Sequence, residues 1–127
     1  MENSGYHQQP HACSVKRYVQ TMELKDDPAL IAEYRRRHAP GQAWQEVLDG
    51  IREVGILEME IYLSGTRLVM VVDAPADFDW EQAMARLATL PRQQEWEEYM
   101  ALFQQCAAQA TSNEKWQMME RIFHLYK

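Results

Sequence analysis

Alternation of apolar and polar side chains predicts the strands of this chain. Residues 15–24 are rich in β-branched and aromatic side chains, which favour extended backbone. Residues 57–63 place apolar side chains at every second position, and a short turn over 64–66 separates them from another extended run over 67–73. These two runs predict a β-hairpin, and residues 115–126 predict a final strand.

Helical periodicity fills the segments between these strands. Two helices are predicted before the hairpin, over 28–38 and 44–54, and a proline–glycine pair separates them. The first is expected to begin with Asp27 as its N-cap and Pro28 at its first position. Another helix opens at 77–79 and is broken by Pro91, and a further one runs over 93–110. Taken with the strands, the order is β-α-β-β-α-β, which predicts a ferredoxin-like α+β fold with helices on one face of an antiparallel sheet.

The opposite face of this sheet also carries large side chains, so we expect it to be covered. A second copy packed back to back is the simplest cover, which predicts a homodimer. Residues 1–14 are polar and predict a disordered N-terminal tail, whereas 15–127 predict a single domain.

Composition limits the classes of partner. The 127 residues fit one domain, and 13 basic against 19 acidic residues give a net charge of −6. That charge argues against nucleic acid or an anionic membrane surface as partner. No apolar run is long enough to span a bilayer, and no signal peptide is evident, so a cytoplasmic location is expected. The two cysteines are far apart, which predicts neither a disulfide framework nor a zinc site.

No familiar catalytic or nucleotide-binding signature occurs, so an enzyme of this sequence would use ordinary acid–base groups without metal or cofactor. His38 shares a predicted apolar helix face with Tyr34, one turn earlier, near a helix C-terminus whose dipole favours a protonated imidazole. Trp96 offers a flat surface for a sugar ring. The same patterns also fit three core side chains, and the sequence pattern alone leaves both interpretations open.

Residues 33–40 form a Glu-Tyr-x-x-x-His-x-Pro segment, and residues 61–63 and 95–100 follow it in the chain. In this order the three segments resemble those of the L-rhamnose mutarotase family. The resemblance extends over roughly 16–125. Within the family, a branch associated with L-fucose is indicated by three stretches, namely 26–34, 65–70 and 114–123.

The resemblance implies a dimeric α+β barrel and a cofactor-independent isomerase that interconverts sugar anomers. It implies His38 as general acid, Tyr34 as a substrate contact and Trp96 as the first of two aromatic sugar contacts. Glu97 stands where the rhamnose enzymes have a second tryptophan, and Met59 stands where they have a second substrate tyrosine. These departures favour a different 6-deoxy-hexose, with L-fucose first.

Three alternatives remain at this point. One is an L-rhamnose mutarotase. Another is a different dimeric α+β barrel enzyme, such as a cofactor-independent monooxygenase or lactone isomerase, because a fold does not determine its chemistry. The third is a non-catalytic ligand-binding module, in which Tyr34, His38 and Trp96 would be core or recognition residues.

Overall fold

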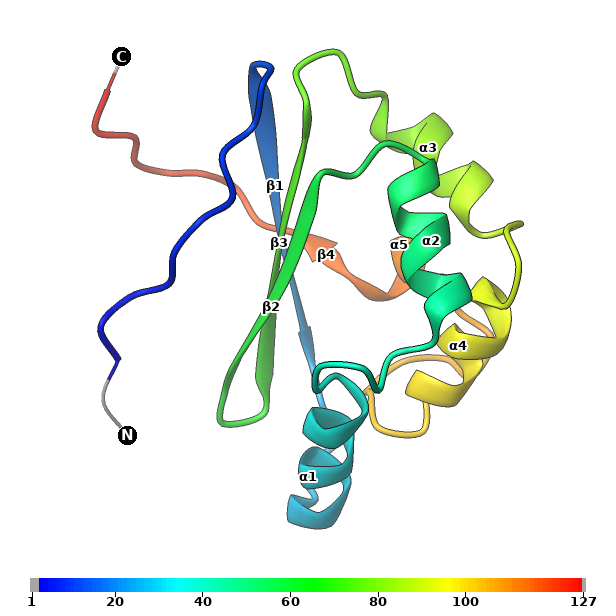
Figure 1. Ribbon diagram of the computed structural model, residues 1–127. Coiled ribbons are helices and arrows are strands. Elements are labelled where there is room, and N and C mark those ends of the chain that lie inside the picture. The colour runs from blue at the N-terminus through cyan, green and yellow to red at the C-terminus, as the bar shows by residue number, and fades with distance from the viewer. Residues whose placement is uncertain (1–2, 127) are drawn as a thin grey trace.

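One antiparallel sheet forms the centre of the protein in a computed structural model that describes residues 3–126 (Figure 1). Its strands are β1 (Val15–Glu23), β2 (Glu58–Ser64), β3 (Arg67–Pro75) and β4 (Gln117–Met118), in the order β2-β3-β1-β4. The predicted hairpin is present as β2 and β3, which pair in antiparallel register from Glu58 opposite Asp73 to Ser64 opposite Arg67. The α+β class and the ferredoxin-like arrangement predicted from the sequence are confirmed.

The helices lie on one side of this sheet, as predicted (Figure 1). Their bounds are α1 (Pro28–Arg37), α2 (Gln45–Glu53), α3 (Trp80–Leu87), α4 (Gln93–Met100) and α5 (Ser112–Lys115). The described N-terminal and C-terminal segments lie on the opposite side (Figure 1). No helix among residues 3–126 is both long and apolar enough to cross a membrane.

Two predicted elements in the C-terminal part are wrong in extent. The helix predicted over 93–110 ends at Met100, because the following backbone bonds to the end of β1 instead: Lys25 N–H donates to Phe103 O, and Gln105 N–H donates to Glu23 O. The strand predicted over 115–126 is reduced to two residues. The last backbone bond of this segment to β1 is from Met119 N–H to Val19 O, and no strand forms beyond it in the described chain.

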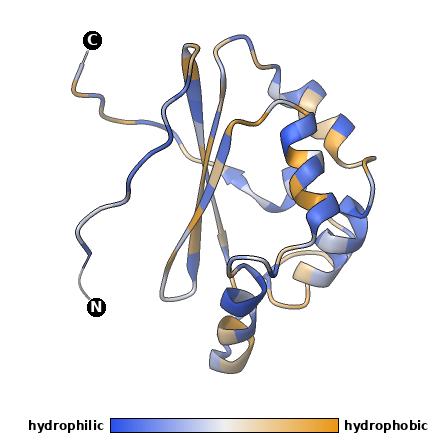
Figure 2. Cartoon of the chain, in the orientation of Figure 1, coloured by the Kyte–Doolittle hydropathy of each residue, from blue (hydrophilic) through white to orange (hydrophobic). Residues whose placement is uncertain are grey.

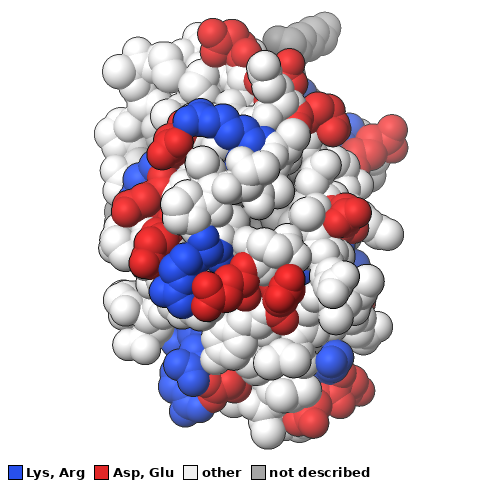
Figure 3. Space-filling model, turned by 90° about the vertical axis from the view of Figure 1, so that its right-hand side faces the viewer, with Lys and Arg blue, Asp and Glu red and all other residues white. Residues whose placement is uncertain are grey.

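The core lies between the sheet and the helices. Alternate residues of β3 face it, and Leu68, Met70 and Val72 are almost fully buried. Apolar side chains of the helices complete this layer, and Figure 2 shows apolar residues on the strands and on several helices. The exposed surface of the helical layer carries charges of both signs, interspersed rather than separated into one patch (Figure 3).

The outer face of the sheet is partly covered by the N-terminal segment. Within residues 3–14 no helix or strand forms, and the Tyr6 ring packs edge to face on Tyr62 with a centroid distance of 5.7 Å. Arg17 forms a two-bonded ion pair with Asp73, at 2.7 and 3.0 Å. The predicted disorder of 1–14 stays a prediction, and residues 1, 2 and 127 lie outside the described part.

Candidate active site

A cavity of about 100 Å³ lies between the inner face of the β2–β3 hairpin and the helices α1, α2 and α4. All five side chains selected from the sequence line it: Tyr34, His38, Met59, Trp96 and Glu97. A neighbouring cavity of about 320 Å³ shares His38 and Met59 with it. The structure therefore brings together residues that are up to 63 positions apart in the chain, from Tyr34 to Glu97.

Helix α1 sets the position of Tyr34 and His38. Its N-cap is Asp27, whose carboxylate accepts hydrogen bonds from the N–H groups of Ala29 and Leu30, as the sequence predicted. One helical turn separates Tyr34 from His38, so the two side chains lie on the same face with ring centroids 4.3 Å apart. The helix ends at His38, which forms its C-cap.

The tautomer of His38 is determined by a local hydrogen bond. Its Nδ1 lies 2.8 Å from the backbone carbonyl oxygen of Tyr34. A carbonyl can only accept, so Nδ1 carries the hydrogen and Nε2 of the neutral ring has a free lone pair. The helix dipole favours a protonated ring, whereas burial lowers the pKa of His38 below its ordinary value and favours the neutral ring.

Trp96 forms an aromatic wall beside this histidine. It is 6% exposed, and its ring stands edge to face against His38 at a centroid distance of 5.7 Å. The Trp44 ring lies 5.0 Å from the Trp96 ring, and the Arg92 guanidinium covers Trp44 at 3.9 Å. These contacts restrict the Trp96 ring, so it can present a rigid surface to a ligand.

Met59 and Glu97 lie on opposite walls of the cavity. Met59 comes from β2 and is half-buried, whereas Glu97 comes from α4 and forms an ion pair with Lys115 at 2.9 Å. The cavity therefore has an apolar wall and a wall with a paired carboxylate. Three polar residues near Glu97 were missed by sequence reasoning.

These missed residues are Gln93, Gln104 and Lys115, all of which are buried. Gln93 and Gln104 line the cavity, and Gln104 bonds both Lys115 and the Tyr34 hydroxyl. The spacing of Gln104 from Trp96 and Met100 could have placed it on their helix face, but this helix ends at Met100. No group of three or more possible metal ligands exists among residues 3–126.

The arrangement can perform proton exchange on a small polar ligand. It offers a neutral imidazole with a free lone pair, a phenol and an aromatic surface in one partly enclosed cavity. Burial raises the pKa of Tyr34 well above its usual range, so its hydroxyl keeps its hydrogen and acts as a donor or acceptor of hydrogen bonds rather than as a phenolate base.

Comparison with known proteins identifies relatives over most of the chain. The sequence profile described as L-rhamnose mutarotase matches residues 17–125. An L-fucose mutarotase of Xanthomonas campestris pv. campestris is 42% identical over 112 residues, which cover 88% of this chain and 90% of that protein. An L-rhamnose mutarotase of Brucella anthropi is 33% identical over 89 residues, covering 68% of this chain and 76% of that protein.

A solved structure has the same fold. The crystal structure of an L-rhamnose mutarotase from Formosa agariphila superimposes with a TM-score of 0.65 and covers 87% of this chain and 99% of its own. The two sequences are 19% identical, so this match supports the architecture and does not by itself identify a substrate.

Proposed function

The chain belongs to the L-rhamnose mutarotase family, and we propose that its substrate is a 6-deoxy-hexose, L-fucose first, whose α and β anomers it interconverts. Mutarotases of this family are carbohydrate isomerases. The observation that carries the proposal is the meeting of Tyr34, His38 and Trp96 around one cavity.

The proposed reaction opens and closes the sugar ring by proton transfer. The O1–H proton leaves to a base, the C1=O1 bond forms, the bond from C1 to the ring oxygen breaks, and the ring oxygen takes up a proton. Rotation about the C1–C2 bond and closure reverse these steps on the other face. His38 Nε2 is suited to exchange a proton with O1 or with the ring oxygen, because Nδ1 is occupied by the Tyr34 carbonyl.

The lining of the cavity suits a 6-deoxy-hexose, and the similarity to named relatives favours L-fucose over L-rhamnose. Trp96 provides the surface on which the C–H side of a sugar ring stacks, and Met59 provides an apolar contact for its methyl group. Glu97 adds a carboxylate that can accept hydrogen bonds from sugar hydroxyls. The 42% identical relative named L-fucose mutarotase supports the same choice. L-rhamnose remains the second candidate, because the 33% identical relative is named for it.

The test is anomer exchange followed by saturation-transfer NMR on L-fucose, L-rhamnose and D-galactose. We expect the wild-type protein to accelerate exchange most on L-fucose. Greater acceleration on L-rhamnose would overturn the choice of sugar but not the reaction. If exchange on all three sugars stays at the rate of buffer alone, the proposed activity is wrong.

We also propose that two copies associate through the outer face of the sheet. The C-terminal segment beyond β4 exposes Ile122, Phe123, Leu125 and Tyr126 to between 72% and 89%. Such a row of apolar side chains is costly in water and is typical of a surface that a partner covers. Sedimentation should show a dimer for the wild type and a monomer for Phe123→Asp. A wild-type monomer would refute this proposal, and a cytoplasmic location stays a prediction.

A further inference from the structure

A chain of hydrogen bonds leads from a fully buried lysine to the candidate active site. The Lys115 side chain is 0% exposed, and its Nζ lies 2.8 Å from Oε1 of Gln104. On the other side of that amide, Gln104 Nε2 lies 3.3 Å from the hydroxyl oxygen of Tyr34. Three residues that are distant in sequence thus form one continuous polar path to the cavity.

The ammonium group determines which way the Gln104 amide points. A lysine ammonium has three donors and no acceptor, so the atom of Gln104 that faces it has to be the oxygen. The amide nitrogen then faces Tyr34, and because this nitrogen can only donate, the hydroxyl oxygen of Tyr34 has to accept. The positive charge therefore sets the direction of both hydrogen bonds.

A hydroxyl that accepts from Gln104 keeps its own hydrogen for another partner. Among residues 3–126, the structure shows no protein acceptor bonded to the Tyr34 hydrogen, and Tyr34 lines the cavity. Burial holds the pKa of this phenol far above neutral pH, so the hydrogen is present. The network thus leaves a hydrogen-bond donor available to a sugar oxygen.

Lys115 itself is fully occupied. Its ammonium bonds the Glu97 carboxylate at 2.9 Å, the Glu97 backbone oxygen at 2.6 Å and Gln104 at 2.8 Å, which accounts for its three hydrogens. The short helix α5 positions it, and a capping box formed by Thr111 and Glu114 holds that helix. Lys115 therefore has no hydrogen left with which to contact a sugar directly.

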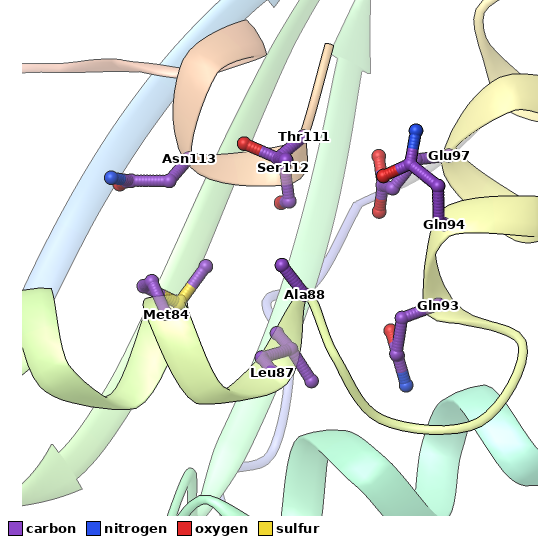
Figure 4. A pocket seen from close by; sticks show the side chains of 9 residues that line it. All are labelled: Met84, Leu87, Ala88, Gln93, Gln94, Glu97, Thr111, Ser112 and Asn113. Carbon is purple, nitrogen blue, oxygen red and sulfur yellow. The ribbon is translucent and has the colours of Figure 1, made fainter. Parts of the chain in front are cut away.

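A second and much smaller space adjoins Glu97. Figure 4 shows Glu97 and Gln94 extending from α4 into a small space that Thr111 and Ser112 border from the α5 side. This space is about 10 Å³, which is room for roughly one water molecule and not for a sugar. Glu97 lines both this space and the sugar cavity, whereas Lys115 lines neither.

We propose that Lys115 is a positioning residue that orients the Gln104 amide and thereby makes the Tyr34 hydroxyl a hydrogen-bond donor to a sugar oxygen during ring opening. This inference rests on the proposed mutarotase function. It assigns to Lys115 and Gln104 a role that is exerted through the hydroxyl group of Tyr34.

A double-mutant cycle between Tyr34→Phe and Gln104→Glu tests the proposal. The carboxylate introduced by Gln104→Glu would still accept from Lys115, but it has no amide hydrogen, so the Tyr34 hydroxyl would turn its own hydrogen to that carboxylate. We expect each single change to lower kcat roughly 10- to 100-fold with KM changed less than about threefold, as for a contact that forms in the transition state. The double variant should be no slower than the slower single variant.

Controls separate this role from a merely structural one. Gln109→Glu makes the same chemical change at an exposed position and should leave kcat unchanged, and thermal unfolding should show that every variant is folded. If the two losses multiply in the double variant, or if Gln104→Glu is as fast as the wild type, the inference is wrong.

A readout without any sugar makes the two proposals separable. The side-chain ¹⁵N–¹H signals of Gln104 should be resolved in the wild type, and Lys115→Met should shift or broaden them, whereas Lys25→Met should not. Unchanged Gln104 signals in Lys115→Met would overturn the inference even in an active enzyme. An inactive wild type with the expected signal changes would refute the mutarotase function and, with it, the role in ring opening, while confirming that Lys115 orients the amide.

Discussion

The two sides of the sheet differ in whether the environment favours the charged or the neutral form of an ionisable side chain. On the inner face, His38 lies half-buried among aromatic rings, and this burial lowers its pKa so that it is neutral at neutral pH. On the outer face, the Arg17 guanidinium bonds Asp73 and lowers the pKa of that carboxyl, which stabilises its charged form. The lowered pKa of His38 favours its uncharged form, because burial penalises charge. The lowered pKa of Asp73 favours its charged form, because an arginine is paired with it.

This contrast fits the different tasks of the two faces. A neutral imidazole with a free lone pair can take a proton, whereas a carboxylate held by an arginine can only add a polar contact between β1 and β3. The inner face is therefore where we place the proposed chemistry. The outer face offers paired charges, half-buried valines and the exposed apolar C-terminal segment, which suit association better than catalysis.

The largest expected effect is the loss of activity on removal of the inner-face imidazole. His38→Ala should slow anomer exchange on the preferred sugar by about 10²- to 10⁴-fold, the usual contribution of a general acid–base group. The exposed His7→Ala is the matched control and should be as fast as wild type. The rate of anomer exchange is measured by NMR for both variants. Equal rates in His38→Ala and wild type would show that His38 takes no part in the mechanism.

Substitutions at two adjacent residues of β3 allow the stability contributed by the two faces of the sheet to be compared. Leu68 is 1% exposed in the core, so Leu68→Ala should lower the free energy of unfolding by about 2–5 kcal/mol. Val69 is half-buried on the outer face, and Val69→Ala should cost roughly 1 kcal/mol or less. Urea denaturation at a protein concentration that keeps the oligomeric state constant measures both. Equal losses would mean that the outer face is as tightly packed as the core.

Acid should weaken the outer-face ion pair first. The folded chain keeps Asp73 ionised at a pH where the unfolded chain protonates it, so this stabilisation is present above the ordinary aspartate pKa and is lost as pH falls through the lowered one. Arg17→Met should cost about 1 kcal/mol at pH 7, since Arg17 is half-exposed, and the difference from wild type should shrink toward pH 2. Urea unfolding across pH checks this, with the exposed Lys25→Met as control. A constant difference at all pH values would contradict the assignment.

The smallest expected effect concerns the helix that carries the catalytic candidates. Asp27→Ala removes the N-cap of α1 and should cost about 1 kcal/mol of stability. The neighbouring Asp26→Ala is the control, because Asp27 and not Asp26 provides the cap. Thermal unfolding should separate the two variants by a few degrees. An equal stability of both variants would show that α1 is held by packing alone.

Local pattern was sufficient for the features that depend on near neighbours. The alternation over 57–63 predicted β2, and the Asp27–Pro28 pair predicted where α1 begins. The one-turn spacing of Tyr34 and His38 placed their rings together. The continuation of α4 to residue 110 was wrong, because the backbone after Met100 pairs with the end of β1, which the periodicity of its own segment does not reveal.

The sequence by itself determined the class of fold, the helix that carries Tyr34 and His38, and five residues that line one cavity. Only the tertiary structure decided that His38 is neutral and that Lys115 reaches Tyr34 through Gln104. The physical reason is that periodicity reports on residues three or four positions apart, whereas burial and hydrogen-bond direction depend on groups such as Gln104 and Tyr34, 70 positions apart. The role of the buried Lys115 ammonium therefore depends on the acceptors that the fold places around it.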